Sequence, residues 1–187
     1  MYEKITSTEQ VLNTCKDLLM NEGFDSINMR RISEACHISL GSLYNYFDSK
    51  GSLIYQLTLN VFDDIFKLDN VEKEKIDTIS KAIKWLHDSF VNGDKKYKHF
   101  ISTHSSIFSD KDKTDGRKMM DKFLLHVQEV LLNILEKDKK VLPNKFTSQK
   151  NKEKFVEYLV RILKISLVER VDDIDDICYF VDQYLYN

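Results

Sequence analysis

Residues that break regular structure are scarce in this chain of 187 residues, which contains one proline and five glycines. Proline and glycine mark turns and the ends of regular elements. Their scarcity, together with abundant Leu, Ile, Lys and Glu, favours helix along nearly the whole chain. The length is sufficient for one or two domains with a substantial core.

Long apolar runs are missing as well. No stretch approaches the roughly 20 apolar residues needed to cross a membrane, and the N-terminus has no signal-peptide pattern. We therefore expect a cytoplasmic protein that does not bind membranes. Cys15, Cys36 and Cys178 are odd in number and widely spaced, and each lies on an apolar stripe. This pattern indicates buried hydrophobic side chains rather than disulfides or metal ligands.

The usual signatures of enzymes and metal sites are absent too. The chain has no glycine-rich phosphate loop, no nucleophile elbow and no metal-binding histidine pair. His87, His104 and His126 lack the short spacing of zinc ligands. Residues 110–116 resemble a calcium loop, but their glycine falls one place late, so we interpret them as a solvated turn. We therefore expect neither catalysis, nor a metal, nor a cofactor.

The most informative segment is 28–50, NMRRISEACHISLGSLYNYFDSK. Asn28 and Ser39 are good helix N-caps, and the apolar positions between and after them suit two short helices that cross over a small core. Upstream, residues 7–10 form a capping box and Gly23 supplies a left-handed helix stop. The inward-facing candidates are Met29, Ile32, Ala35, Cys36, Ile38, Leu43 and Phe47.

These residues resemble the DNA-binding end of the TetR family of transcriptional regulators. The family's run of alanine-glycine-valine-serine-x-glycine-x-leucine-tyrosine-x-histidine/tyrosine-phenylalanine, then serine-lysine, corresponds to Cys36–Phe47 and Ser49–Lys50. His37 stands in place of the turn glycine, and Gly51 replaces a residue that is usually acidic or helix-favouring. The match covers the first third of the chain in motif detail and the rest only in length and helical character.

The resemblance implies a homodimeric repressor that binds a palindromic operator in double-stranded DNA. Base edges in the major groove would be read by residues 40–42 and Asn45, and phosphates would be held by tyrosine hydroxyls and Lys50. Leu40 could contact a thymine methyl group, which favours AT-rich sites. The candidate DNA-contacting residues are Asn28, Arg30, Arg31, Ser39, Leu40, Gly41, Ser42, Tyr44, Asn45, Tyr46 and Lys50.

The charge of the first 50 residues limits how DNA can be bound. They hold five Lys/Arg and seven Asp/Glu, so the domain is not basic overall. Binding would depend on a local patch rather than on a global positive field.

The expected architecture is all-α with about nine helices. Residues 1–50 form a three-helix helix-turn-helix DNA-binding domain, helix 50–68 connects, and residues 69–187 form a helical effector-binding and dimerisation domain. Breaks are expected at 110–116 and around Pro143. The predicted helices are 7–22, 29–36, 40–46, 50–68, 74–92, 95–109, 117–137, one that includes 155–168, and one that includes 174–185.

In this family the second domain commonly holds a small molecule whose binding releases the DNA. Aromatic and methionine side chains with a few polar tips suit a mostly apolar ligand. The alternatives are that these residues are plain core, and that the body responds to a protein partner or to no effector. The candidates are Trp85, Phe90, Phe100, His104, Phe108, Met119, Phe123, His126 and Tyr158.

The C-terminal helices carry the dimerisation prediction. Ten of the fourteen residues from 155 to 168 are apolar, and a helix that is apolar over most of its circumference must be covered on nearly all sides. The final helix covers only part of it, so a four-helix bundle with a second copy is the simplest cover. The alternative is a helix buried inside the monomer. The interface candidates are Phe155, Leu159, Ile162, Ile174, Ile177, Val181 and Tyr184.

Overall fold

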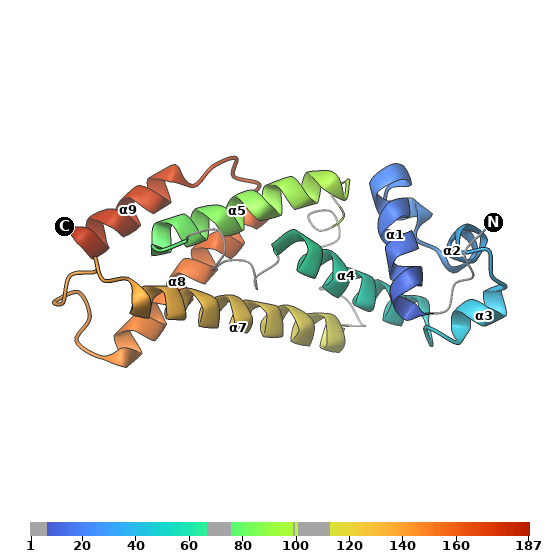
Figure 1. Cartoon of the computed structure of the whole chain (residues 1–187), viewed down its shortest axis with the longest axis horizontal. Helices are drawn as coiled ribbons and strands as arrows, with labels where there is room; N and C mark the ends of the chain where they lie inside the picture. The colour runs from blue at the N-terminus through green and yellow to red at the C-terminus, as the bar shows by residue number, and fades with distance from the viewer. Residues whose placement is uncertain (1–6, 67–75, 99, 101–112) are drawn as a thin grey trace. The chain divides into compact units, whose positions relative to one another are not determined.

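A computed structural model describes residues 7–66, 76–98, 100 and 113–187. Within these ranges every regular element is a helix and no strand is present, which confirms the all-α prediction (Figure 1). Most of the helix predicted at 95–109 lies outside the described residues. The described helices are α1 (Thr8–Glu22), the short 3-10 helix η1 (Phe24–Ser26), α2 (Met29–Ala35), α3 (Leu40–Tyr44), α4 (Lys50–Phe66), α5 (Ile79–Lys96), α7 (Lys113–Lys137), α8 (Gln149–Val168) and α9 (Asp175–Tyr186).

The chain divides into two compact units. The N-terminal unit comprises Met1–Asp64 and Gly93–Arg117, and the C-terminal unit comprises Ile65–Asn92 and Lys118–Asn187. Of the described residues that the sequence analysis placed in the second domain, 93–98, 100 and 113–117 group with the N-terminal unit. None of the described helices combines the length and hydropathy needed to span a membrane.

The first helix is fixed by the signals that the sequence predicted at its two ends. The Ser7 hydroxyl accepts a hydrogen bond from the Gln10 amide, and the Gln10 side chain accepts one from the Ser7 amide, both at 3.2 Å. Gly23 ends α1 with φ at +84°, a conformation that favours glycine. The predicted apolar stripe of α1 is buried and comprises Val11, Leu12, Cys15, Leu18 and Leu19.

The helix-turn-helix segment also begins its helices where the sequence predicts. The Asn28 side chain accepts a hydrogen bond from the Arg31 amide at 2.9 Å, and the Ser39 hydroxyl accepts one from the Ser42 amide at 3.0 Å. His37, in the turn between α2 and α3, has a φ of +55°. Ile32, Cys36, Leu43 and Phe47 are buried, whereas Met29, Ala35 and Ile38 are only half-buried.

Both ends of α5 differ from the prediction. Helix α5 begins at Ile79 rather than 74, because the Thr78 hydroxyl accepts a hydrogen bond from the Lys81 amide at 3.4 Å and caps the helix there. It then continues through Gly93 to Lys96, where the prediction ended it at 92.

The interpretation of 110–116 as a solvated turn was wrong for its last four residues. Helix α7 begins at Lys113 and includes Gly116. A glycine inside a helix costs about 1 kcal/mol relative to alanine. The other residues of this 25-residue helix offset that cost.

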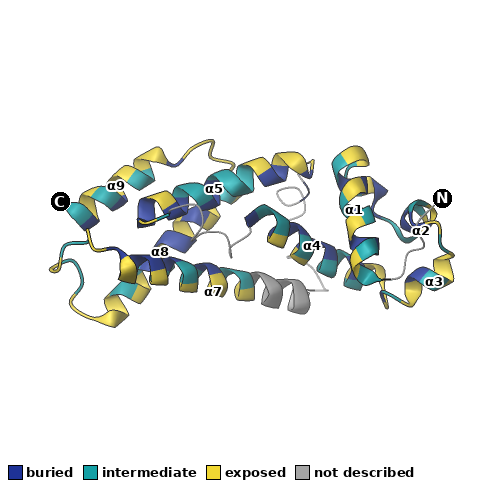
Figure 2. Cartoon of the chain, in the orientation of Figure 1, coloured by how far each residue is buried: buried dark blue, intermediate teal, exposed yellow. Residues whose placement is uncertain are grey.

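The C-terminal unit joins α5, α7, α8 and α9 around an apolar core, and Figure 2 shows buried and exposed positions alternating along α8. Phe66 at the end of α4 contacts the rings of Phe90 and Phe123, with centroids 6.4 and 4.9 Å away. A polar contact also holds the segment between α8 and α9, because the His87 ring nitrogen Nε2 lies 2.9 Å from the Val171 carbonyl oxygen. The buried apolar side chains of this unit include Ile79, Ile83, Leu86, Leu131, Val156, Val160 and Leu185.

Candidate nucleic-acid interface

One face of α3 is exposed, and it carries residues that the sequence predicted to read bases. Leu40 and Tyr44 lie one turn apart and are 42% and 47% exposed. Gly41 and Asn45 are exposed beside them. Leu43 on the opposite side is completely buried. The short helix is therefore held by one apolar side chain and presents the other side outward.

The start of α3 is organised by two hydroxyl groups. The Ser39 and Ser42 hydroxyl oxygens lie 2.8 Å apart, in addition to the capping bond between Ser39 and the Ser42 amide. A Cβ atom built on Gly41 would meet nothing closer than the Ser39 hydroxyl oxygen at 3.8 Å. The fold itself therefore has room for a side chain at Gly41.

The predicted phosphate ligands lie at the end of α3 and shortly after it in the chain. Tyr44 and Lys50 are exposed and Tyr46 is half-buried. Lys50 is the first residue of α4, whose start is capped by Ser49, because the Ser49 hydroxyl accepts a hydrogen bond from the Ser52 amide at 3.0 Å. The sequence analysis missed this cap, although a serine directly before a helix is its usual signal.

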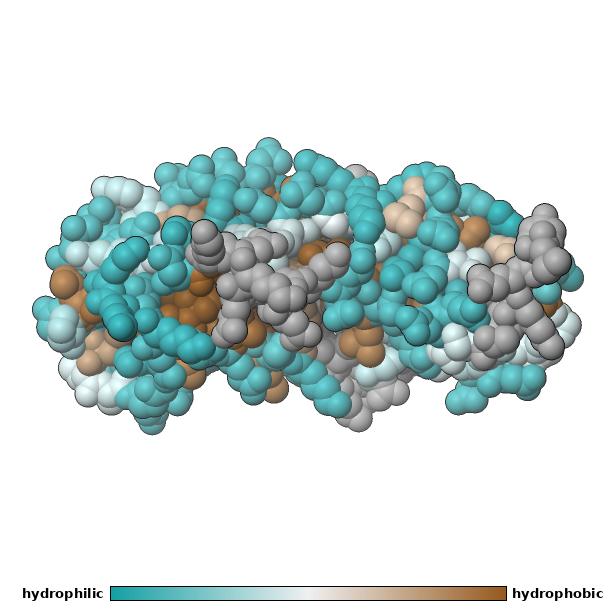
Figure 3. All heavy atoms as spheres, in the orientation of Figure 1, coloured by the Kyte–Doolittle hydropathy of each residue, from teal (hydrophilic) through white to brown (hydrophobic). Residues whose placement is uncertain are grey.

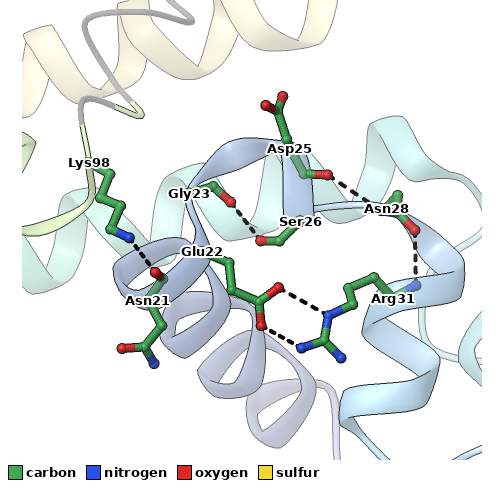
Figure 4. A network of polar contacts seen from close by, with 8 residues as sticks. All are labelled: Asn21, Glu22, Gly23, Asp25, Ser26, Asn28, Arg31 and Lys98. Carbon is green, nitrogen blue, oxygen red and sulfur yellow. Dashed lines mark hydrogen bonds and ion pairs between the residues drawn. The ribbon is translucent and has the colours of Figure 1, made fainter.

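The two adjacent arginines of α2 differ in their surroundings. Arg30 is exposed. The Arg31 guanidinium instead forms a bidentate ion pair with Glu22 of α1; its Nε atom donates to Oε2 at 3.1 Å and an outer nitrogen donates to Oε1 (Figure 4). The hydrogen bond from Arg31 lowers the pKa of the Glu22 carboxyl below its usual value. Arg31 is therefore already engaged within the protein.

Those predicted ligand-binding residues that the structure describes divide between the two units. Phe90 and Phe123 are brought together by Phe66, which the sequence analysis did not include. Phe100 belongs to the N-terminal unit, where its ring packs on Phe24 at 5.4 Å. Trp85 is half-buried, and His126 and Tyr158 are exposed. His104 and Phe108 lie outside the described residues, as does the side chain of Met119.

The predicted interface residues divide between the interior and the surface. Leu159, Ile174 and Val181 are buried within the monomer, Phe155 and Ile177 are half-buried, and only Ile162 and Tyr184 are exposed. The end of the view in Figure 3 that carries α8 and α9 shows apolar patches among hydrophilic residues. The large apolar side chains exposed on these two helices are Tyr158, Ile162, Ile165, Val168, Tyr179, Phe180 and Tyr184.

Sequence comparison identifies the N-terminal part of the chain. Residues 11–57, which include α2, α3 and the start of α4, match the model of the family "Bacterial regulatory proteins, tetR family". The N-terminal domain belongs to the tetR family. The HTH-type transcriptional regulator UidR of Escherichia coli K12 is 38% identical to the chain over 50 residues. The HTH-type transcriptional repressor KstR2 of Rhodococcus jostii RHA1 is 24% identical over 121 residues.

These sequence relatives are matched over part of their length. The match to UidR covers 27% of this chain and 26% of UidR, and the match to KstR2 covers 59% of each. Likeness beyond the tetR-family domain is therefore mainly a likeness of fold.

Two solved structures share the fold over most of the chain. SCO7518 from Streptomyces coelicolor A3(2), described as a transcriptional regulator, has a TM-score of 0.57 at 14% identity and covers 96% of this chain and 98% of its own. BioQ in complex with its double-stranded DNA operator has a TM-score of 0.50 at 12% identity, with 89% and 86% covered. The tetR-family domain and the helices that follow it thus have counterparts in both structures.

Proposed function

We propose that this chain is a DNA-binding transcriptional regulator that represses from a palindromic operator as a homodimer. The observation that carries this proposal is the exposed face of α3, which presents Leu40, Gly41, Tyr44 and Asn45 on a tetR-family helix-turn-helix. The structural neighbour BioQ was solved with its operator, and KstR2 is described as a repressor.

The exposed face of α3 suits direct reading of base edges. The Asn45 amide can pair with both the acceptor and the donor on an adenine edge, and Leu40 can pack on a thymine methyl group. The fold has room for a Cβ atom at Gly41, so packing within the protein does not require a glycine at this position. The absence of a side chain there instead lets a DNA strand approach the backbone of α3.

The residues proposed to contact phosphates come from α3, from the residues that follow it and from α2. The Tyr44 hydroxyl and the Lys50 ammonium are exposed, and Tyr46 and Arg30 extend the set. Because the domain has no net positive charge, these few contacts would supply most of its attraction to the DNA backbone.

The exposed apolar side chains of α8 and α9 support a homodimer. Tyr158, Ile162, Ile165 and Val168 follow one another at helical spacing, and Val168 is 65% exposed. Phe180 of α9 is 69% exposed. Contiguous apolar side chains of this size are characteristic of interfaces. We propose that a second copy covers these side chains. The helix-turn-helix segments of both copies would then bind one operator.

A small, mostly apolar effector remains our proposal for the C-terminal unit. Its support is the aromatic cluster of Phe66, Phe90 and Phe123. An effector that binds one dimer geometry better than another would shift the population toward it and release the DNA. The alternative is control by a protein partner or by no effector.

In vitro selection from a random duplex library tests the proposed function directly. We expect it to yield a palindromic site, because two copies related by twofold symmetry read two half-sites. The Asn45→Ala variant should select a different consensus, since a good bidentate contact contributes roughly 1–3 kcal/mol of discrimination. Lys139→Ala, an exposed lysine of the C-terminal unit, serves as the control and should select the parent consensus. Failure of the parent chain to enrich any site would refute the proposal.

A further inference from the structure

The last turn of α1 is held by cations from two different segments. Arg31 approaches it from α2, and Lys98 approaches it from the turn that follows α5 (Figure 4). Arg31 binds the Glu22 carboxylate, and the Lys98 ammonium donates to the backbone carbonyl of Asn21. All four residues belong to the N-terminal unit.

Lys98 is held in an unusual conformation for this contact. Its φ is +47°, in the left-handed region that favours glycine. Its Cδ atom lies 3.8 Å from the position that a Cβ atom on Gly23 would take, so the stem of the lysine passes over the residue that ends α1. The last carbonyl groups of a helix have no partner within the helix. The Lys98 ammonium supplies one.

The residues around Lys98 are anchored to the same unit by independent contacts. Asp64 of α4 accepts hydrogen bonds from the Lys96 ammonium at 2.5 Å and from the Tyr97 hydroxyl at 2.6 Å. Two residues after Lys98, the ring of Phe100 packs on Phe24. The end of α5 is thus fixed to α4, to η1 and to the last turn of α1.

On the other side of Glu22, Arg31 connects the same turn to α2. The guanidinium binds Glu22, and the backbone amide of Arg31 donates to the Asn28 cap at the start of α2. The positive charge of Lys98 adds to the hydrogen bond from Arg31 in lowering the pKa of Glu22. The contact of Lys98 with Asn21 and the ion pair of Glu22 with Arg31 are therefore joined through the backbone of two neighbouring residues, and together they connect Lys98 to the first residues of α2.

We propose that Lys98 is a positioning residue for α2 and α3, the two helices that carry most of the proposed DNA contacts. By holding the last turn of α1, Lys98 fixes the carboxylate of Glu22, and Glu22 fixes Arg31 and the start of α2. The inference rests on the proposed DNA binding, and it assigns a role to a residue that lies far outside the helix-turn-helix in the sequence.

A comparison of Lys98→Met with Lys95→Met tests the proposal. Lys95 lies in the last turn of α5, is exposed, and has no ion pair within the described chain, so its variant removes the same charge without the contact. We expect Lys98→Met to raise the Kd for the duplex recovered by selection by roughly three- to tenfold more than Lys95→Met does. Lys98→Arg keeps a donor for the carbonyl and should restore most of the affinity.

The link through Glu22 is tested in a double-mutant cycle. In a Glu22→Gln background, Lys98→Met should change the Kd no more than Lys95→Met does, because the connection to Arg31 is already broken. If the effects of Glu22→Gln and Lys98→Met multiply independently, or if Lys95→Met weakens binding as much as Lys98→Met, the proposal is wrong.

Hydrogen exchange of the free protein separates this inference from the proposed function. We expect the amides of residues 31–35 to exchange faster in Lys98→Met and in Glu22→Gln than in the parent chain, and unchanged exchange in Lys95→Met. Equal exchange in all four proteins would overturn the positioning role even if DNA binds. Faster exchange in the two variants, with no duplex selected by the parent chain, would support the link and reject the DNA-binding function. If Lys98→Met fails to fold, Lys98→Gln takes its place in the same comparison, because it also removes the ammonium that contacts the last turn of α1.

Discussion

At the scale of single residues, His37 shows how a turn can keep its geometry after losing its glycine. The sequence places histidine where the family has glycine, and the backbone there still adopts a φ of +55°. A side chain at such an angle brings its Cβ atom close to the neighbouring carbonyl oxygen. The small core formed by Ile32, Leu43 and Phe47 imposes this turn in spite of the local cost.

We therefore predict that His37→Gly stabilises the protein. Relief of the positive φ should raise the free energy of unfolding by about 1 kcal/mol, less the backbone entropy that glycine loses on folding. Urea unfolding followed by circular dichroism measures the change. His37→Ala is the matched control, because it removes the imidazole and keeps the Cβ atom, and it should give no such gain. A lower unfolding midpoint for the glycine variant would show that the histidine side chain stabilises the turn.

The helix caps were among the features of this structure that the sequence predicted best. The caps Ser7, Asn28 and Ser39 act as the sequence predicts, because each forms its bond within three residues. The pairing of Glu22 with Arg31 could not be predicted in the same way, since it depends on how α1 crosses α2. Arg31 was therefore assigned to DNA alone, while the structure gives it a partner within the protein.

At the scale of elements, α3 has only five residues and depends on its surroundings. So short a helix has no stability of its own in water. It is held by the Ser39 cap and by burial of Leu43, while Leu40 on the same helix is exposed. The side chain that holds α3 in place and the side chains proposed to read DNA are thus different residues of one short helix.

Substitution of the two leucines of α3 should separate these roles. Leu43→Ala removes a fully buried side chain and should lower the free energy of unfolding by roughly 2–5 kcal/mol. Leu40→Ala should change it by no more than about 0.5 kcal/mol, yet alter the selected DNA sequence. Thermal unfolding and in vitro selection measure the two effects. Equal destabilisation by both substitutions would contradict the orientation of α3.

Helix boundaries were less predictable than the helices themselves. Apolar periodicity located α1, α4, α8 and α9, because each buries a continuous stripe. It misplaced the starts of α5 and α7. Helix α5 begins after the Thr78 cap, and α7 begins before an internal glycine that had indicated a turn. Such choices are decided by packing that lies outside the local sequence.

At the scale of the whole molecule, the exposed apolar side chains of α8 and α9 form the surface that we propose for dimerisation. The sequence predicted that α8 needs cover on nearly all sides, and the described chain leaves Ile165 and Val168 more than half exposed. Periodicity alone could not say which apolar residues face the monomer core. Leu159, Ile174 and Val181 were therefore predicted at the interface, although they are buried within the monomer.

We predict that the parent chain is a dimer in solution and that Ile165→Glu with Val168→Glu makes it a monomer. Two buried carboxylates without partners would each cost several kcal/mol in the proposed interface. Sedimentation equilibrium at micromolar concentration measures the mass. Lys164→Glu, also exposed on α8, is the control and should remain dimeric. A dimeric double variant would place the assembly surface elsewhere, and a monomeric parent chain would refute the proposed dimer.

The central claim is that the exposed face of α3 and the start of α4 lie on a DNA duplex. The most direct test is fluorescence anisotropy of the selected duplex at increasing salt concentration, with the parent chain, Lys50→Ala and Lys139→Ala. We expect the logarithm of the affinity of the parent chain to fall steeply with the logarithm of salt concentration, and Lys50→Ala to reduce that slope by about one per subunit. Lys139→Ala should leave the slope unchanged. A slope that is the same for all three proteins would contradict the claim.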